Sequence, residues 1–463
     1  MIIKRITSPG IAHHSYFVGA VDYAAVIDPR RDCDIYLDLA KQHNLKIKYI
    51  LETHRNEDYV IGSLELGRLT GAEIYHGPGI NWGYGNTLID GDSVEFDNIN
   101  LSCIHTPGHT DESMSYALKD LDFGARVVLF TGDTLFVGDV GRVDLKGESE
   151  ISRMASALYE SLFNRIMPLG DEIIICPAHG NDSVCGGHIA SRDESTIGIE
   201  RNYNPVLKKN REEFVRYKIS EKLDRPPYFR KMEEYNLSGP PLLRDVLEPG
   251  PMSPGEVLCE VGNGAVVIDT RHPSSFAGAH IKNSYNIWEE GLSAFAGWII
   301  NYEKPIILNI EEAAHLEKSA VYLRRVGYDR IIGYLKNGIE GWYGGGFPIE
   351  SFVQFSVHEL KNKLDSGEKL TLVDVRGESE WETGHIEQAV HIYVGNLEEK
   401  LSKIPPENPV TVICSIGNRS GIGASVLERA GYKDISAVPG GMMAWAGAGF
   451  PITRREKMDI KAA

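Results

Sequence analysis

Four short polar segments carry residue types that could bind a metal ion. They read Thr-His-Arg-Asn-Glu-Asp-Tyr at 53–59, His-Thr-Pro-Gly-His-Thr at 105–110, Thr-Gly-Asp-Thr at 131–134 and Cys-Pro-Ala-His-Gly at 176–180. Each follows an apolar run that predicts a buried strand. Residues at the ends of neighbouring strands can converge at one edge of a sheet. A lone histidine after a strand is usually structural, but four such segments together predict a metal site.

A fifth segment, Val-Ile-Cys-Ser-Ile-Gly-Asn-Arg-Ser at 412–420, could do nucleophilic sulfur chemistry. A strand delivers Cys414 to a tight loop that opens a helix, so that successive backbone N–H groups would form an anion-binding nest. The helix dipole and the charge of Arg419 would favour the thiolate, which is the nucleophilic form of cysteine. We therefore expect Cys414 to be catalytic, with a substrate-binding cradle made of Ser415, Gly417, Asn418 and Arg419.

The elements that must position these residues are short apolar runs that alternate with helical patterns. In the N-terminal half we expect strands at 24–28, 47–51, 127–131 and 173–176, with helices at 33–43 and 152–163. In the C-terminal half, runs such as 266–268 and 410–413 alternate with helices. This alternation predicts an α/β protein whose C-terminal half contains parallel sheets.

A proline-rich stretch at 226–254 indicates an extended connector between the two halves. Beyond it, the sequence at 266–287 is repeated at 371–392. The matched pairs are Asp269 with Asp374 and His280 with His385 at an offset of 105, and Trp342 with Trp445 at an offset of 103. Units of this length are duplicated domains. We expect domains at 1–240, 250–352 and 353–455.

Composition excludes several classes of function. A net charge of -17 argues against a nucleic-acid partner, which would require clustered basic residues. No apolar stretch approaches the ~18 residues of a membrane span, and the N-terminus lacks the apolar core of a signal peptide. The six cysteines form no Cys-x-x-Cys pair, so neither a disulfide framework nor a zinc knuckle is indicated. We expect a cytoplasmic protein with no membrane partner, assembled as a homo-oligomer (a dimer or a tetramer).

The N-terminal segments resemble the metallo-β-lactamase superfamily over roughly residues 1 to 240, which implies an α/β/β/α sandwich. The usual first motif of that family, H-x-H-x-D-H, serves two zinc ions together with later residues. Here Asn56 stands in place of the second histidine and Tyr59 in place of the last. The second metal position is therefore weakened, and the chain resembles the persulfide dioxygenase branch of the superfamily.

In that branch one mononuclear Fe(II) is held by the residues that match His54, His109 and Asp133, a facial triad with open positions. Asp58 and His179 would then orient ligands or water, or be relics of a dinuclear site. Two further residues are weaker candidates: Cys185 could line the iron pocket and carry sulfane sulfur, or be an inert buried thiol, and Arg142 could contact an anionic thiol substrate.

The C-terminal repeats resemble the rhodanese family. Four residues separate Cys414 from Arg419, as in sulfurtransferases, whereas the related phosphatases have one more. Adding 105 to Asn309 gives 414, so we expect Asn309 at the cysteine position of the first copy and no catalysis there.

Together these resemblances imply oxidation of a thiol persulfide by O2 to sulfite, coupled to sulfur transfer in which thiosulfate is formed or used, as in sulfide detoxification. Two alternatives stay open. One is a zinc-dependent thioester hydrolase of the glyoxalase II type, which would use a metal-bound hydroxide and have an accessory sulfurtransferase. The other is a non-enzymatic sulfur sensor or scaffold.

Overall fold

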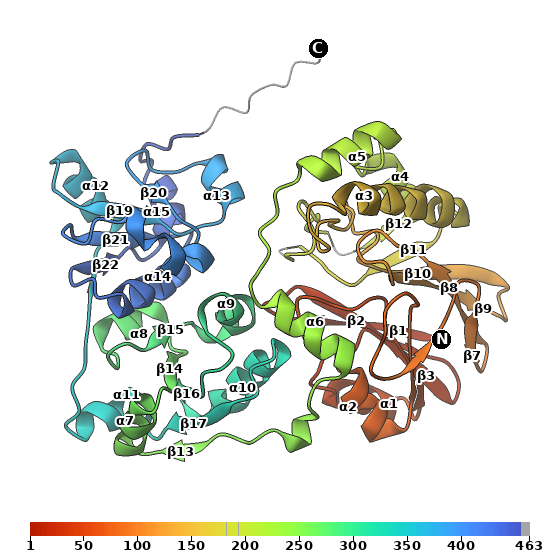
Figure 1. The fold of residues 1–463 in the computed structure, drawn as a ribbon, viewed down its shortest axis with the longest axis horizontal. Helices are drawn as coiled ribbons and strands as arrows, with labels where there is room; N and C mark the ends of the chain where they lie inside the picture. Colours follow the sequence, from red (N-terminus) through yellow and green to blue (C-terminus); the bar gives the residue numbers. More distant parts are fainter. Residues whose placement is uncertain (182, 193, 455–463) are drawn as a thin grey trace, which may run out of the picture. The chain divides into compact units, whose positions relative to one another are not determined.

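The computed structural model describes residues 1–454 apart from 182 and 193 (Figure 1). The chain divides into two compact units. The first holds Met1–Val246 with Arg324–Gly327, and the second holds Leu247–Leu323 with the described residues from Tyr328 onward.

Two six-stranded sheets form the centre of the first unit. The first sheet has the order β1-β2-β3-β4-β5-β6, with β1 (Ile2–Ser8), β2 (His13–Gly19), β3 (Tyr23–Ile27), β4 (Lys46–Leu51), β5 (Glu73–His76) and β6 (Asn86–Thr87). The second has the order β12-β11-β10-β9-β8-β7, with β7 (Ser93–Phe96), β8 (Ile99–His105), β9 (Met114–Asp120), β10 (Ala125–Gly132), β11 (Ile174–Pro177) and β12 (Ser195–Thr196).

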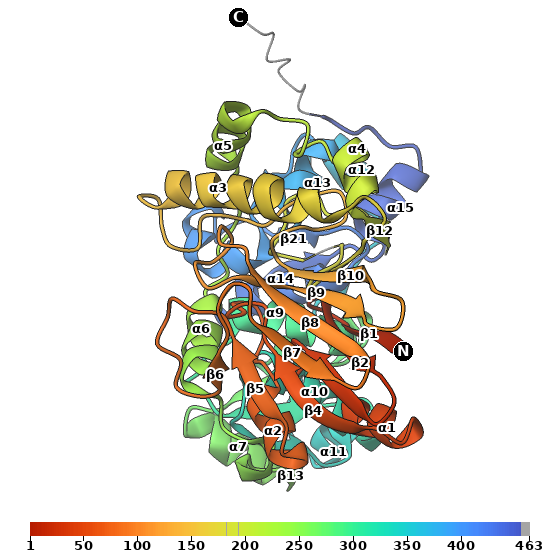
Figure 2. The same ribbon diagram turned by 90° about the vertical axis from the view of Figure 1, so that its right-hand side faces the viewer.

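Side-chain alternation along the strands explains why both faces of each sheet are covered. Ala25 and Ile27 of β3 pack between the two sheets with Phe130, whereas Ala24 and Val26 pack toward the helices. Helices α1 (Asp34–Gln42) and α2 (Ser63–Thr70) cover the first sheet, and α3 (Ile151–Glu160), α4 (Ile197–Tyr203) and α5 (Arg211–Ser220) cover the second. Figure 2 shows these four layers. The expected α/β/β/α sandwich is confirmed.

The second unit contains two five-stranded sheets in which every pair of neighbouring strands is parallel. One has the order β13-β17-β16-β14-β15, with β13 (Gly250–Met252), β14 (Val266–Asp269), β15 (Tyr285–Asn286), β16 (Ile306–Asn309) and β17 (Ile331–Leu335). The other has the order β18-β22-β21-β19-β20, with β18 (Val353–Gln354), β19 (Thr371–Asp374), β20 (Val390–His391), β21 (Val410–Ile413) and β22 (Ile435–Ala437). The two orders are equivalent, so the duplication predicted from the sequence is confirmed.

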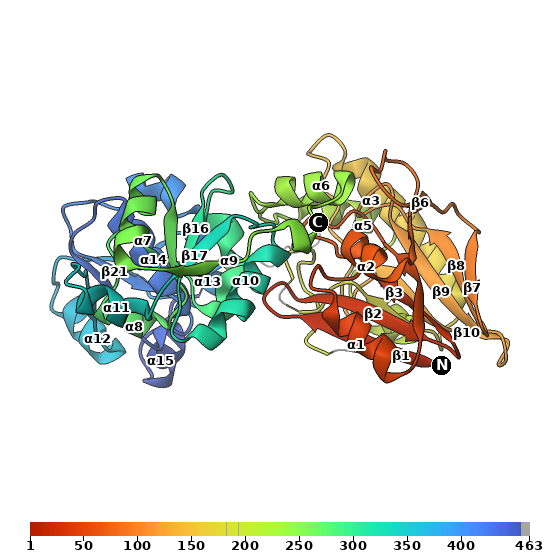
Figure 3. The same ribbon diagram turned by 90° about the horizontal axis from the view of Figure 1, so that it is seen from below.

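Helices lie on both faces of each parallel sheet. The first copy has α7 (Pro254–Gly262), α8 (Pro273–Gly278), α9 (Leu292–Ile299), α10 (Leu316–Arg325) and α11 (Gly338–Gly344). The second has α12 (Val357–Asp365), α13 (Glu378–Thr383), α14 (Asn418–Arg429) and α15 (Gly441–Gly447). Figure 3 shows α7 and α11 on one side of β16 and β17, with α9 and α10 on the other.

The two copies also begin in the same way, because each first helix opens with a capping box. Ser253 and Glu256 exchange backbone and side-chain hydrogen bonds at the start of α7. Ser356 and Glu359 do the same at the start of α12. In the part of the chain that the structure describes, no helix is both long enough and apolar enough to span a membrane.

Candidate metal centre and sulfur-transfer loop

The carboxyl ends of β4, β8 and β10 bring His54, His109 and Asp133 together in the interior of the first unit. The Nε2 atoms of His54 and His109 lie 3.8 and 3.5 Å from Oδ2 of Asp133. All three side chains are buried, and neither Nε2 atom makes a hydrogen bond of good geometry to a described residue. Buried polar atoms without a partner are costly. Two imidazoles and a carboxylate in this arrangement fit a divalent first-row metal ion.

Hydrogen bonds on the far side of each ring aim these nitrogens into the cluster. The Thr53 hydroxyl donates to Asp28 (2.7 Å), so it accepts a hydrogen bond from Nδ1–H of His54 (2.9 Å). Nδ1–H of His109 donates to the carbonyl of Arg142 (3.1 Å). Burial lowers the pKa of His54 to about 4, which keeps this ring neutral as metal binding requires. Such outer contacts commonly orient the ligands of metal sites.

Glu57, for which the sequence motifs predict no role, also lies in this cluster. Its Oε1 is 3.1 Å from Nε2 of His109, and its Oε2 is 3.8 Å from Nε2 of His54. Burial alone would lower the pKa of His109, but the Glu57 carboxylate raises it to about 9. One signal in the sequence could have found Glu57. It lies in the same polar segment as His54 and adds a carboxylate to the candidate ligands of that segment.

His179, which follows β11, lies between two carboxylates. Its Nδ1–H donates to Oδ1 of Asp133 (2.8 Å), and its Nε2 is 2.9 Å from Oδ2 of Asp58. Burial opposes protonation of this ring, but Asp133 and Asp58 together raise its pKa well above the ordinary value. A protonated His179 thus holds the carboxylate of Asp133 in place while pairing with Asp58.

Cys185 lies at the same cluster, where its Sγ donates to Oε1 of Glu57 (3.4 Å). The side chain is fully buried, and burial raises the pKa of its thiol well above the ordinary value. Cys185 therefore lies beside the candidate metal ligands as a protonated thiol. A protonated thiol is a poor nucleophile.

Arg142 lies behind His109. Its Nε and Nη2 donate to Asp144 at 2.7 and 2.8 Å, and its Nη1 donates to the carbonyl of Val184 at 2.9 Å. The side chain is buried. The predicted contact of Arg142 with an anionic thiol has no support in these contacts. The guanidinium of Arg142 forms an ion pair with Asp144, and the backbone carbonyl of Arg142 orients His109.

The predicted nucleophile, Cys414, directly follows β21 at the start of a tight loop. The backbone N–H of Gly417 donates to its Sγ (3.1 Å), and α14 begins at the next residue. Gly417 has a φ of 107°, a conformation that favours glycine. The backbone N–H of Met442, in α15, donates a hydrogen bond to the carbonyl of Cys414 (2.8 Å) and so fixes the loop. Glycine is also required at 441, because a Cβ there would lie 2.1 Å from that carbonyl oxygen.

Arg419 and Ser415, both predicted to bind substrate, contact Glu380 of α13. The guanidinium donates to Glu380 at 2.6 and 2.7 Å, and Ser415 donates to the same carboxylate. Burial alone would raise the pKa of Glu380, but Arg419 and Ser415 lower it to about 2. Glu380 is therefore ionised and balances the charge of the predicted anion-binding arginine. Glu380 lies 39 residues before Arg419, outside the Cys414 motif, so the motif does not indicate it.

The chain matches two known protein families. The profile of the metallo-beta-lactamase superfamily matches residues 9–179, and the profile of the rhodanese-like domain matches residues 253–344 and 356–448. A solved metallo-beta-lactamase from Staphylococcus aureus subsp. aureus COL is 30% identical, with a TM-score of 0.64, over 72% of this chain and 98% of that chain. The chain belongs to the metallo-beta-lactamase superfamily. It also carries two rhodanese-like domains, as the sequence predicted.

Two curated relatives match the metallo-beta-lactamase part of the chain. Persulfide dioxygenase ETHE1, mitochondrial, of Bos taurus is 28% identical over 244 residues, which are 49% of this chain and 83% of that protein. Hydroxyacylglutathione hydrolase GloC of Haemophilus influenzae is 28% identical over 207 residues, which are 40% of this chain and 87% of that protein. Since these names describe different reactions, the identities alone do not choose between them.

In the first rhodanese-like domain, the strand register corrects the expected position of the missing nucleophile. Asn309 pairs with the aspartate that ends β14, whereas Ile413 pairs with the equivalent aspartate of β19. The residue that corresponds to Cys414 is therefore Ile310, and not Asn309 as predicted. The connection from β14 to β16 is one residue longer than that from β19 to β21, and this shifts the offset from 105 to 104. Asn309 instead donates a hydrogen bond to Asp269 (2.7 Å).

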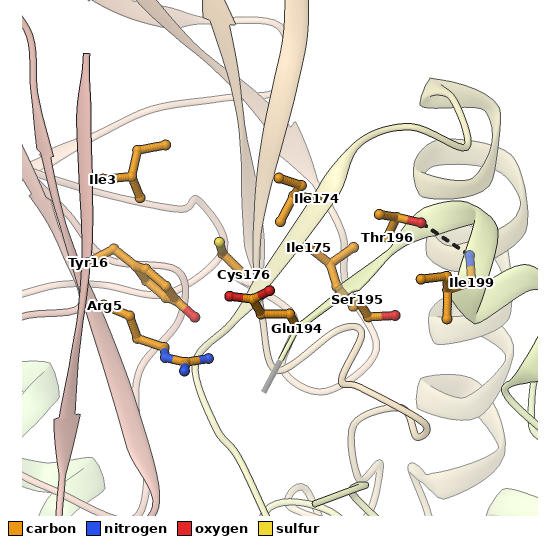
Figure 4. A pocket seen from close by; sticks show the side chains of 10 residues that line it. All are labelled: Ile3, Arg5, Tyr16, Ile174, Ile175, Cys176, Glu194, Ser195, Thr196 and Ile199. Carbon is orange, nitrogen blue, oxygen red and sulfur yellow. Dashed lines mark hydrogen bonds between the residues drawn. The ribbon is translucent and has the colours of Figure 1, made fainter. Parts of the chain in front are cut away.

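An open pocket of about 650 Å³ lies elsewhere in the metallo-beta-lactamase domain, between β1, β2, β11 and β12 (Figure 4). Arg5, Tyr16, Cys176 and Glu194 are among its lining residues. Burial raises the pKa of the Cys176 thiol to about 12, so this cysteine is protonated. None of the predicted site residues lines this pocket.

Proposed function

We propose that the metallo-beta-lactamase domain oxidises a low-molecular-weight thiol persulfide with O2, and that the second rhodanese-like domain transfers sulfane sulfur through Cys414. One observation carries the first part. His54, His109 and Asp133 form a buried cluster in which the Nε2 atoms of both histidines face the carboxylate of Asp133. Positions 56 and 59 supply no imidazole for a second metal ion. This arrangement supports a single Fe(II).

Fe(II) in this cluster would supply open coordination positions for an anionic persulfide sulfur and for O2. The overall reaction balances as R–S–S⁻ + O2 + H2O → R–SH + SO3²⁻ + H⁺. The chain's own contribution is to hold the ligands, since Thr53 fixes His54, the carbonyl of Arg142 fixes His109, and His179 fixes the carboxylate. Burial of the cluster also limits access of bulk water.

At the second site, the Cys414 thiolate would attack the outer sulfur of a persulfide. The S–S bond of the donor breaks, the donor thiolate leaves with the electron pair, and Cys414 becomes a persulfide. The N–H of Gly417, which donates to Sγ, would stabilise the anionic sulfur in both forms. Transfer of that sulfur to sulfite gives thiosulfate and restores the thiolate. The same steps in reverse would consume thiosulfate to load a thiol.

The similarity to hydroxyacylglutathione hydrolase GloC favours a second candidate, a zinc thioester hydrolase. The absence of imidazoles at 56 and 59, and the pairing of His179 with two carboxylates, count against it. Metal analysis after anaerobic purification, followed by thioester and persulfide turnover assays, would separate the two. Zinc with thioester hydrolysis would replace our proposal, and iron with persulfide-dependent O2 consumption would support it.

A further inference from the structure

Glu57 has no assigned role, yet its carboxylate faces the candidate metal ligands. Its side chain is 1% exposed, and its Oε2 makes no hydrogen bond to a described residue. The Nε2 atoms of His54 and His109 are also buried and make no hydrogen bond of good geometry to a described residue. Buried polar atoms without a hydrogen-bond partner are unfavourable. Three unsatisfied atoms that face one another therefore point to a missing cation.

The spacing of these atoms fits a common ion. One ligand atom each from His54, Glu57 and His109 lies within 4.8 Å of the others. Two atoms bound at ~2.1 Å to one ion lie roughly 3.0 Å apart at right angles and roughly 3.4 Å apart at tetrahedral angles. The contact of Glu57 with His109, at 3.1 Å, falls within this range, and the contact with His54, at 3.8 Å, is 0.4 Å longer than its upper end. Asp133 lies at similar distances from both histidines.

We propose that Glu57 is a fourth protein ligand of the metal, taking the place of the imidazole that Asn56 cannot supply. The ligand set would then be two histidines and two carboxylates, His54, His109, Asp133 and Glu57. Two carboxylates balance the charge of a divalent ion, and four protein ligands leave two positions of a six-coordinate ion for substrates. The inference deepens the proposed function, but its test needs only the cation and no persulfide.

The test compares wild type with Glu57→Gln, which keeps the shape of the side chain and removes its charge. Metal-free protein is titrated anaerobically with Co(II) against a chromophoric chelator, and the visible absorption of bound Co(II) is recorded. We expect Glu57→Gln to bind Co(II) at least ~100-fold more weakly, beyond the loss typical of outer-sphere changes. Its Co(II) band intensities should also change, because they depend on coordination number. Glu160→Gln is the matched control, since Glu160 pairs with Arg211 outside the cluster, and it should bind Co(II) as wild type does.

Circular dichroism and the rise in Tm on adding Co(II) separate ligand loss from misfolding. A folded Glu57→Gln protein with wild-type Co(II) affinity, spectrum and Tm rise would overturn the proposal and leave Glu57 as an ion-pair partner of His109. If Glu57→Gln does not fold, Glu57→Asp decides, because an unchanged Co(II) spectrum in that variant contradicts ligation. Altered Co(II) binding without persulfide oxidation in the iron form would support the ligand and count against the proposed reaction.

Discussion

Glu380 and Arg419 form a bidentate ion pair beside the Cys414 loop. Nη1 of Arg419 donates to Oε2 of Glu380 at 2.6 Å, and Nη2 donates to Oε1 at 2.7 Å. Arg419 also donates to Ser415 Oγ at 2.8 Å. The arginine expected to attract an anionic substrate is thus already neutralised by a carboxylate of α13. Its attraction for a dianion such as thiosulfate should be weaker than its position in the loop suggests.

Glu380→Gln should strengthen thiosulfate binding. A partly exposed ion pair is worth about 1 kcal/mol, so freeing Arg419 should lower the KM for thiosulfate by roughly fivefold. The rhodanese assay with thiosulfate and cyanide measures this, with kcat recorded separately. Glu378→Gln, on the same helix, is the control. An unchanged or higher KM in Glu380→Gln would show that the pair does not limit anion binding.

Thr53→Val should weaken metal binding without removing a ligand. The hydroxyl of Thr53 links Asp28 to Nδ1 of His54, and its loss frees the ring to rotate or to change tautomer. Changes of this kind cost ~10- to 100-fold in metal affinity. Competition with a chelator measures the effect, with Thr70→Val as a control on helix α2. Equal affinity in wild type and Thr53→Val would mean that this hydrogen bond does not hold His54.

Restoring a cysteine to the first rhodanese-like domain should not restore activity. The structure places the position at Ile310, where Glu311 and Glu312 follow and no glycine or arginine completes the loop. Ile310→Cys in a Cys414→Ala background should therefore show no thiosulfate sulfurtransferase activity above the Cys414→Ala background. Turnover in the double variant would mean that the loop can still bind an anion.

Persulfide treatment should label Cys414 and leave Cys185 unmodified. Burial keeps the thiol of Cys185 protonated, whereas Sγ of Cys414 accepts a backbone N–H that favours an anionic sulfur. Anaerobic incubation with glutathione persulfide, alkylation and peptide mass spectrometry should find an added sulfur atom on the Cys414 peptide. An added sulfur atom on Cys185 would instead show that this residue carries sulfane sulfur beside the candidate metal ligands.

The strands and their terminal site residues could be predicted because apolar runs and polar ends are local features of the sequence. The strands expected at 47–51 and 127–131 are observed as β4 and β10, and His54 and Asp133 follow them as expected. The Cys414 loop could be predicted for the same reason. In each case the sequence neighbours of the residue determine its place.

Side-chain partners from distant elements could not be predicted in this way. Glu380 meets Arg419 only because α13 packs beside the start of α14, and 39 residues separate the two. The shift from Asn309 to Ile310 arises from one extra residue in a connection, which an alignment of motif ends does not locate. The family motif specifies no residue type at position 57, and the contact of Glu57 with His109 depends on how the loop folds.

Oxygen consumption by anaerobically prepared, iron-loaded protein on addition of glutathione persulfide tests the central claim most directly, with sulfite and thiosulfate both quantified. We predict one O2 consumed per sulfite equivalent formed in wild type. Cys414→Ser should keep the oxygen uptake but form less thiosulfate and more sulfite. Asp133→Ala should lose both iron and oxygen uptake. Iron-loaded wild type that consumes no oxygen with glutathione, coenzyme A, bacillithiol or cysteine persulfides would contradict the account.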